Sequence, residues 1–248
     1  MGEYAFGAQP PEEPVEFSPE ILTQPNAQLA VHNRTDITPL KQYLASIETH
    51  FPHRLFQATG HRSSKFPAEL QPPITRKSNH ATRTAELVLP TSPNNKKRHE
   101  TLQRFMLVND SVTIAAEVPV FVTKDDLGYY RSRGFDLEFD SAVITGHIDF
   151  LQIRNGHIHI LDYKPEARKE THAHVQLTIY ALALARRASL PLRLFKCGWF
   201  DEKDYFEFFP LQAVFPNPDN LVGERSLRLH GGFTKMKDEQ QTNPAHIE

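Results

Sequence analysis

Apolar residues in the middle of the chain form short segments of strand length, interrupted by a turn and by one segment of helical period. Residues 142–153 and 158–164 are rich in branched apolar side chains, and Arg-Asn-Gly at 154–156 joins them. An Asn-Gly turn between two such segments predicts a β-hairpin. Residues 172–187 repeat apolar positions at helical spacing, and residues 192–200 form another apolar segment. A helix that links two strands predicts a parallel pair, so we expect an α/β fold with a mixed sheet.

Two acidic residues and a lysine lie on the predicted hairpin. Side chains alternate between the two faces of a strand, so Asp162 and Lys164 share one face while Tyr163 points to the other. The hairpin brings Asp149 alongside Asp162. Two adjacent carboxylates can hold one Mg²⁺ ion, which prefers oxygen ligands and keeps several waters. A lysine beside that ion can stabilise the charge on a phosphate under attack, so the three residues predict metal-dependent phosphodiester cleavage.

The helix predicted at 172–187 adds two polar residues next to this site. Gln176 and Tyr180 lie four residues apart and therefore share one helix face, beside an apolar stripe. An amide and a hydroxyl suit phosphate or sugar oxygens without specifying a base. We expect both side chains to orient a nucleic-acid strand, and the alternative is that Tyr180 is a core aromatic residue with a solvated hydroxyl.

Taken in order, these residues resemble the motifs of the PD-(D/E)XK nucleases, and within them the RecB-like branch that also includes lambda exonuclease. The similar motifs are Gly-x-x-Asp at 146–149, Asp-Tyr-Lys at 162–164 and Gln-x-x-x-Tyr at 176–180, within a region from about 96 to 210. The resemblance implies a restriction-endonuclease-like αβββαβ core, in which helices flank a central mixed sheet. It also implies DNA hydrolysis with Mg²⁺ or Mn²⁺ as cofactor and an exonuclease that acts in DNA repair, recombination or mobile-element processing.

Two further positions match the family less closely. Glu117 corresponds to the acidic residue that opens the first core strand, and His99 to the histidine of the first helix. The resemblance implies that either side chain can add a metal ligand, together with the main-chain carbonyl of Tyr163. The family's glycine before that histidine is absent, because Ser-Pro-Asn-Asn stands at 92–95. His99 can therefore equally be an exposed helix histidine, and Glu117 an ordinary edge-strand carboxylate.

Other functions compete with this interpretation. A lone Asp-x-Lys on a strand is usually a solvated polar face. Several histidines surround the predicted site and favour zinc over magnesium, although no His-Glu-x-x-His spacing is present. A non-catalytic module that binds nucleic acid or assembles with other proteins on the nuclease fold is a further alternative. The histidines that suggest zinc are His147, His157, His159, His172 and His174.

Charge is unevenly distributed along the chain, although the net charge is only −2. Residues 51–104 contain ten Lys or Arg and three acidic residues, whereas residues 105–170 contain seven and eleven. A basic flank beside an acidic metal site suits a DNA backbone held next to bound cations. We expect the phosphate contacts to include Arg76, Lys77, Lys96, Lys97 and Arg98, with Arg54, Arg62 and Lys65 as further candidates.

The remaining segments suggest three regions. Residues 1–80 hold ten of the nineteen prolines and are expected to be partly extended, with a short helix near 38–51. Residues 81–215 form the expected nuclease core, in which 205–211 adds a strand, and 216–248 form a C-terminal extension with a short helix at 220–229. The single cysteine, Cys197, cannot hold an iron–sulfur cluster and is expected to be buried.

No sequence segment has the length and apolarity of a membrane span, and the first residues lack a secretory signal pattern. We therefore expect a cytoplasmic protein without a membrane partner. The expected partners are DNA and, in a repair or recombination complex, a helicase or recombinase.

Overall fold

The structure is a computed structural model, and its described residues are 36–50, 52, 54–57, 61–63, 68–92, 94, 97–135 and 143–215. Several predictions fall outside these residues: the extension at 216–248 with its helix at 220–229, the conformation of residues 1–35, and the contacts assigned to Lys65, Lys96 and the side chain of Arg62. Among the described helices, none is long and apolar enough to cross a membrane.

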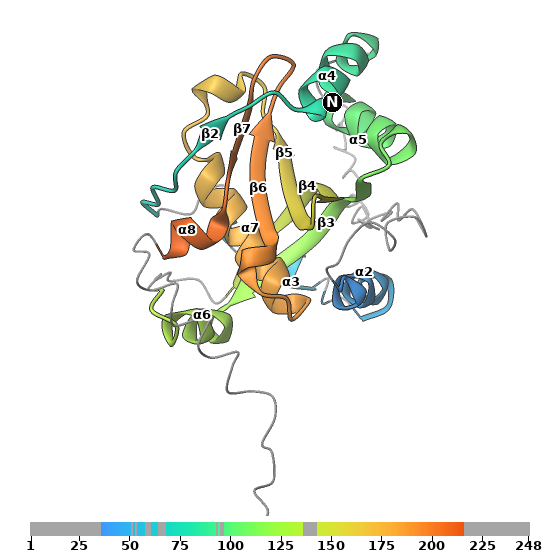
Figure 1. Ribbon diagram of the computed structural model, residues 1–248. Coiled ribbons are helices and arrows are strands. Elements are labelled where there is room, and N and C mark those ends of the chain that lie inside the picture. The colour runs from blue at the N-terminus through green and yellow to red at the C-terminus, as the bar shows by residue number, and fades with distance from the viewer. Residues whose placement is uncertain are drawn as a thin grey trace, which may run out of the picture.

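A mixed sheet of seven strands forms the centre of the described part of the chain (Figure 1). Its order is β1-β4-β5-β6-β7-β2, and β3 also pairs with β4. The β3–β4, β4–β5, β6–β7 and β7–β2 pairs are antiparallel, whereas β1–β4 and β5–β6 are parallel. The strands are β1 (His61–Arg62), β2 (Thr75–Arg76), β3 (Thr113–Thr123), β4 (Val143–Arg154), β5 (His157–Tyr163), β6 (Phe195–Phe200) and β7 (Tyr205–Phe208).

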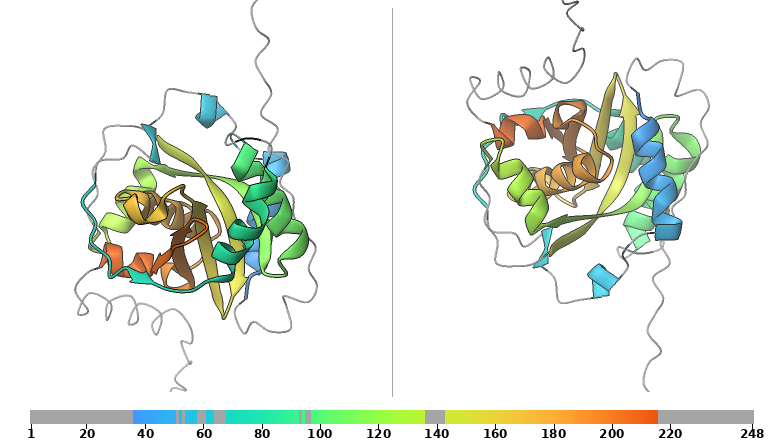
Figure 2. Two further views of the ribbon diagram at one scale, coloured as in Figure 1. Left: turned by 90° about the horizontal axis from the view of Figure 1, so that it is seen from above. Right: turned by 90° about the horizontal axis from the view of Figure 1, so that it is seen from below.

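Helices cover this sheet on two sides. Figure 2 shows α7 on one side of β4 and β5 and α4 and α5 on the other. In chain order, α5, β3, β4, β5, α7 and β6 reproduce the predicted αβββαβ core, so the fold class is confirmed. The helices are α2 (Thr38–His50), α3 (Arg54–Gln57), α4 (His80–Val88), α5 (Arg98–Asn109), α6 (Lys124–Arg131), α7 (Ala173–Arg187) and α8 (Pro210–Val214). The 3₁₀ turns that lie wholly within the described ranges are η2 (Leu89–Thr91), η4 (Ala167–Lys169) and η5 (Leu192–Leu194).

The hairpin of β4 and β5 forms as the sequence predicts. Asn155 and Gly156 both have positive φ, 51° and 77°, the backbone of a tight two-residue turn that matches the twist of the strands. Helix α7 then crosses over and returns the chain to β6, which pairs in parallel with β5. Cys197 on β6 is buried as predicted, and its thiol donates to the carbonyl of Leu177 at 3.4 Å.

The strand predicted at 205–211 ends earlier than expected. β7 stops at Phe208, and Pro210 begins α8. Proline has no N–H for a strand ladder, whereas its fixed φ suits the first turn of a helix. The helix predicted at 38–51 is present as α2 and packs within the chain, because Leu40 and Ile47 are fully buried.

Two clusters of buried side chains pack against the sheet. The larger contains most of α7, and the smaller joins Ala85 and Met106 of α4 and α5 to the sheet. On β4, Ile148 and Leu151 belong to the larger cluster although they are three residues apart, while Phe150 belongs to the smaller. The regular alternation of strand faces is therefore interrupted at Asp149.

Helix α7 approaches β4 most closely at Gly146. A Cβ atom at this position would overlap the ring of Tyr180 and lie 2.8 Å from the hydroxyl of Ser63. Only glycine leaves room for the tyrosine ring across the strand, which links the glycine of Gly-x-x-Asp to the tyrosine of Gln-x-x-x-Tyr.

Gly146→Ala should therefore destabilise the protein by about 1–3 kcal/mol, the usual effect of overpacking, without changing the denaturant slope in a urea titration. Gly128→Ala on α6 is the matched control, because a Cβ there meets nothing within 4 Å, and it should be neutral or slightly stabilising. In the Gly146→Ala/Tyr180→Ala double variant the two losses should be less than additive. Equal stability of Gly146→Ala and the control would contradict this packing.

Candidate active site

Two carboxylates meet at the hairpin of β4 and β5. The register pairs Phe150 with Leu161, which places Asp149 opposite Asp162 on the neighbouring strand. The side chain of Asp149 is 14% exposed and that of Asp162 only 4%. The main-chain N–H of Tyr163 donates to Asp149 Oδ2 at 3.0 Å and fixes this carboxylate against the end of β5. The structure thus brings together the two acids that the sequence predicts as metal ligands.

The electrostatics of this pair favour a bound cation. Burial, and then the negative charge of Asp162, raise the pKa of Asp149 well above its ordinary value. Glu117 raises it further, and the hydrogen bond from Tyr163 opposes the shift only in part. Without an added positive charge, two ionised carboxylates at this position repel each other in a partly desolvated site.

Lys164 supplies one positive charge directly. Its Nζ lies 2.8 Å from Asp162 Oδ2 and donates to Gln176 Oε1 at 3.1 Å. Burial alone would lower the pKa of Lys164, but Asp162 and Asp149 outweigh it, and the net shift is upward. The amine therefore remains an ammonium at neutral pH. Its main-chain N–H donates to the carbonyl of Phe200, which holds the residue at the end of the β5–β6 ladder.

Gln176 and Tyr180 lie on α7 directly behind Lys164. Gln176 Nε2 donates to Tyr180 Oη at 2.8 Å, and both residues are buried, with 8% and 4% exposed. Their hydrogen bonds in this structure go to Lys164 and to each other, and the phosphate contacts expected from the sequence stay a prediction. The observed chain of bonds restricts the position of the ammonium.

Helix α5 and strand β3 complete the rim of the site. Glu117 falls opposite Asp149 in the β3–β4 register, and its φ of 52° is in the left-handed region. His99 Nδ1 lies 3.4 Å from Asp149 Oδ2, and its ring forms a T-shaped contact with the ring of Tyr163. Burial lowers the pKa of His99, so the ring is neutral at pH 7 and able to bind a metal.

Gln103 is a site residue that the sequence did not predict. Its amide donates to Glu117 Oε1 at 2.5 Å and to the carbonyl of Asp149 at 3.5 Å. It follows His99 by four residues, one turn along α5, so the two side chains share a helix face. That spacing is the only sequence signal that indicates it.

The donor atoms fit a hard divalent cation that retains water. Asp162 Oδ2 is buried and, apart from its ion pair with Lys164, accepts no hydrogen bond from the described residues. In the described ranges, no group of three or more His, Cys, Asp or Glu side chains converges closely enough to hold an ion by itself. Two carboxylates, a main-chain carbonyl and waters are a ligand set that Mg²⁺ accepts, because Mg²⁺ usually keeps several waters.

The histidines considered for zinc are arranged differently. His159 is buried near Lys196 and Glu207, and burial followed by the charge of Lys196 lowers its pKa to about 4. His157 packs against Phe209, and the ring of His147 lies 5.1 Å from that of Phe56. His157 and His159 also form a T-shaped pair, with their ring centroids 6.4 Å apart, and in the described part of the chain no three of these side chains converge on one ion.

The predicted basic contacts lie near the same end of the sheet. Arg98 forms an ion pair with Glu202, Arg76 one with Asp204, and Lys77 one with Glu207 at 2.5 Å. The side chains of Arg76 and Lys77 are still 59% and 51% exposed, and Lys97 is exposed.

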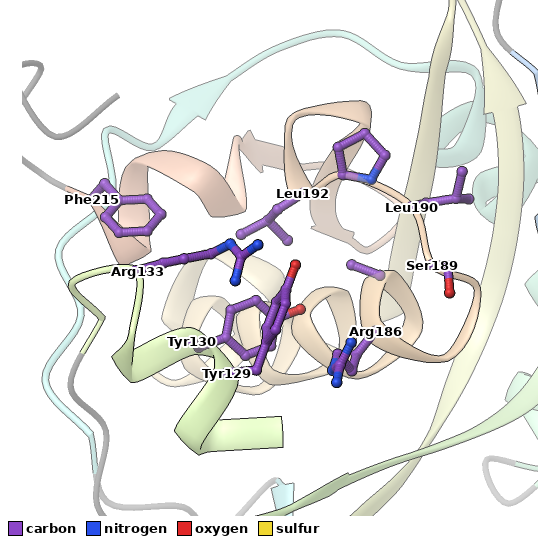
Figure 3. Close-up of a pocket in the computed structure, with 10 residues that line it drawn as sticks. Tyr129, Tyr130, Arg133, Arg186, Ser189, Leu190, Leu192 and Phe215 are labelled. Atoms are coloured by element: carbon purple, nitrogen blue, oxygen red, sulfur yellow. The ribbon is translucent and has the colours of Figure 1, made fainter. Parts of the chain in front are cut away.

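A separate cavity of about 290 Å³ lies between α6 and the C-terminal end of α7 (Figure 3). The ring of Tyr129 lies there between the guanidinium groups of Arg133 and Arg186, at 3.8 and 4.1 Å from its centroid. Arg186 is ten residues beyond Gln176, about 15 Å along the helix. The lining contains no carboxylate, so this cavity is not the acidic site.

The raised pKa of Asp149 predicts how the stability of the metal-free protein depends on pH. Because the folded chain holds this proton more tightly than the unfolded chain, the free energy of unfolding falls as the pH rises from 3.8, the ordinary value, through the raised pKa. In chelator at pH 7, Asp149→Asn should raise Tm by about 2–4 °C, the effect of ~1 kcal/mol in a domain of this size, and the gain should vanish near pH 4. Asp125→Asn, at an exposed site on α6, should give no gain. A lower Tm for Asp149→Asn at pH 7 would argue against repulsion in the pair.

Comparison with known proteins agrees with this geometry. The family described as the PD-(D/E)XK nuclease superfamily matches residues 50–207, which is more than half of the chain. The match begins earlier than the predicted resemblance and includes β1, β2 and α4 as well as every site residue described above. A search of curated proteins finds no match. On the family match and the geometry of its site, the chain belongs to the PD-(D/E)XK nuclease superfamily.

Proposed function

We propose that the protein is a divalent-metal-dependent deoxyribonuclease that hydrolyses phosphodiester bonds at the Asp149–Asp162 pair. One observation carries this proposal: two partly desolvated carboxylates face each other, and an ammonium group lies 2.8 Å from one of them. This arrangement provides oxygen ligands for a cation and a fixed positive charge for the phosphate. Membership of the nuclease superfamily supports DNA as the substrate.

Different residues of the site would bind the metal and stabilise the charge on the phosphate. Asp149 and Asp162 would hold Mg²⁺ or Mn²⁺, with the carbonyl of Tyr163 and with Glu117 or His99 as further ligands. When bound, the cation supplies positive charge that lowers the pKa of the attacking water and offsets charge on the phosphate.

Lys164 stabilises the negative charge that develops on the phosphate oxygens during attack. The ammonium group of Lys164 donates a hydrogen bond to Gln176 Oε1, and Gln176 Nε2 donates one to the hydroxyl of Tyr180. These bonds fix the position of the positive charge before the substrate binds. Gln103 bridges Glu117 to the main chain of β4 and so fixes the position of that carboxylate.

The more specific functional proposals rest on the sequence motifs. We propose a RecB-like exonuclease that acts in DNA repair, recombination or mobile-element processing in the cytoplasm, with a helicase or recombinase as partner. The order and spacing of the three motifs at 146–149, 162–164 and 176–180 support this branch.

Removing the ammonium group separates catalysis from binding. Lys164→Ala should lower the Mg²⁺-dependent cleavage rate of DNA by about 100-fold or more, because one positioned charge donor is lost from the transition state. DNA affinity, measured by fluorescence anisotropy in chelator, should change by less than about threefold. Lys169→Ala is the matched control, since Lys169 is exposed and its one ion pair among the described residues is with Glu166, and it should cleave like the wild type. Unchanged cleavage by Lys164→Ala would refute the assignment.

Substrate topology tests the exonuclease proposal. An enzyme that requires an end should degrade linear DNA with Mg²⁺ or Mn²⁺ and leave covalently closed circles intact, as followed by gel electrophoresis. Cleavage of circles would show an endonuclease, whereas full DNA binding without cleavage of either form would favour the non-catalytic module.

A further inference from the structure

A basic cavity of about 400 Å³ lies where the chain passes from β2 into α4. Its walls come from three parts of the chain: the end of β2, the start of α4 and the turn between β6 and β7. No acidic residue is among the residues that line it, which are Arg76, Lys77, Ser78, Asn79, Thr82, Arg83 and Lys203.

The cations of this cavity retain net positive charge. Arg83 and Lys203 are exposed, and neither forms an ion pair with another described residue. Arg76 pairs with Asp204 and Lys77 with Glu207. The side chains of these two acids are only 10% and 7% exposed, so the cations are the more exposed partner in each pair. Lys196 also contacts the acid of the second pair, Glu207, at 2.7 Å, so this single carboxylate is shared by two lysines.

Uncharged donors accompany the charges. The hydroxyl of Thr82 is buried and has no hydrogen-bond partner among the described residues. Asn79 caps α4 by accepting from the N–H of Ala81 at 2.9 Å, so the positive end of the helix dipole also faces this region. Guanidinium, ammonium and hydroxyl donors, of which Arg83 and Lys203 have no ion pair with a described acid, suit phosphate oxygens.

The cavity adjoins the acidic site through the β6–β7 turn. Lys203 is next to Glu202, whose carboxylate oxygens lie 3.4 and 3.5 Å from the hydroxyl of Tyr163, the residue between Asp162 and Lys164. Helix α4 packs against α5, which carries His99, and Figure 1 shows α4 beside the tip of the β6–β7 hairpin. A strand bound at the acidic pair can therefore continue along this edge of the sheet.

We infer that this cavity binds backbone phosphates of the nucleic-acid strand at a distance from the scissile bond. The inference rests on the proposed function, because it makes the cavity a second contact for the same substrate. The contact depends on charge and not on base identity. It should therefore raise the affinity for nucleic acid of any base sequence and make that affinity more dependent on salt concentration.

Charge reversal at two sites tests this contact against a control of equal net charge. Arg83→Glu/Lys203→Glu reverses the two unpaired cations of the cavity, and Lys41→Glu/Lys124→Glu reverses two exposed lysines on α2 and α6. Affinity for a fluorescein-labelled 20-nucleotide single strand and for the corresponding duplex is measured by anisotropy in chelator at several NaCl concentrations. Chelator prevents cleavage, so binding is read without catalysis.

The cavity variant should bind at least about tenfold more weakly. Its plot of log K against log salt should be shallower by about 1.8 for the duplex and about 1.4 for the single strand, as expected for two lost phosphate contacts. The control should stay within about threefold of the wild type. Equal losses in the two double variants, or no loss in either, would overturn the inference. Binding of inorganic phosphate that is lost in the cavity variant, with DNA affinity unchanged, would also overturn it.

A parallel cleavage assay of the wild type with Mg²⁺ separates this inference from the proposed function. A wild type that binds DNA through the cavity but does not cleave would contradict the function and support the contact. A wild type that cleaves, with a cavity variant that binds like the control, would contradict the contact alone.

Discussion

The repulsion between Asp149 and Asp162 is the constraint around which this end of the protein is organised. Hairpin pairing places the two carboxylates on neighbouring strands, where solvent screens them little, and the pKa of Asp149 rises in response. One ammonium group, on Lys164, offsets part of the charge. A divalent cation would offset the rest, so the positions of the donor atoms and the electrostatics of the pair support the same proposal.

The fold holds this unfavourable pair through contacts that are themselves stable. Gly146 lets the ring of Tyr180 lie across β4, Tyr180 accepts from Gln176, and Gln176 accepts from Lys164. The glycine, glutamine and tyrosine of the sequence motifs thus form one packed path from strand to helix to ammonium group. In this arrangement Tyr180 helps to position Lys164 through its hydrogen bond with Gln176.

The local patterns were sufficient to predict the centre of the site. Alternation along β5 places Asp162 and Lys164 on one face, and the Asn-Gly turn sets the register that adds Asp149. Gln103 was not predicted, because its place beside Glu117 depends on how α5 packs on the sheet. The strands β1 and β2 have two residues each and are formed by pairing with β4 and β7, so they leave no periodic pattern in the sequence. The left-handed backbone of Glu117 likewise has no sequence signal.

A calorimetric titration of Mn²⁺ into the wild type and into Asp162→Asn tests the central claim most directly. Asp162→Asn preserves the shape of the side chain but removes one of the two charges that a cation would neutralise. We expect saturable binding to the wild type and an affinity at least about tenfold lower in the variant, comparable to the loss of a metal-supporting residue. Equal affinity in the two proteins would contradict the account of the acidic pair as a metal centre.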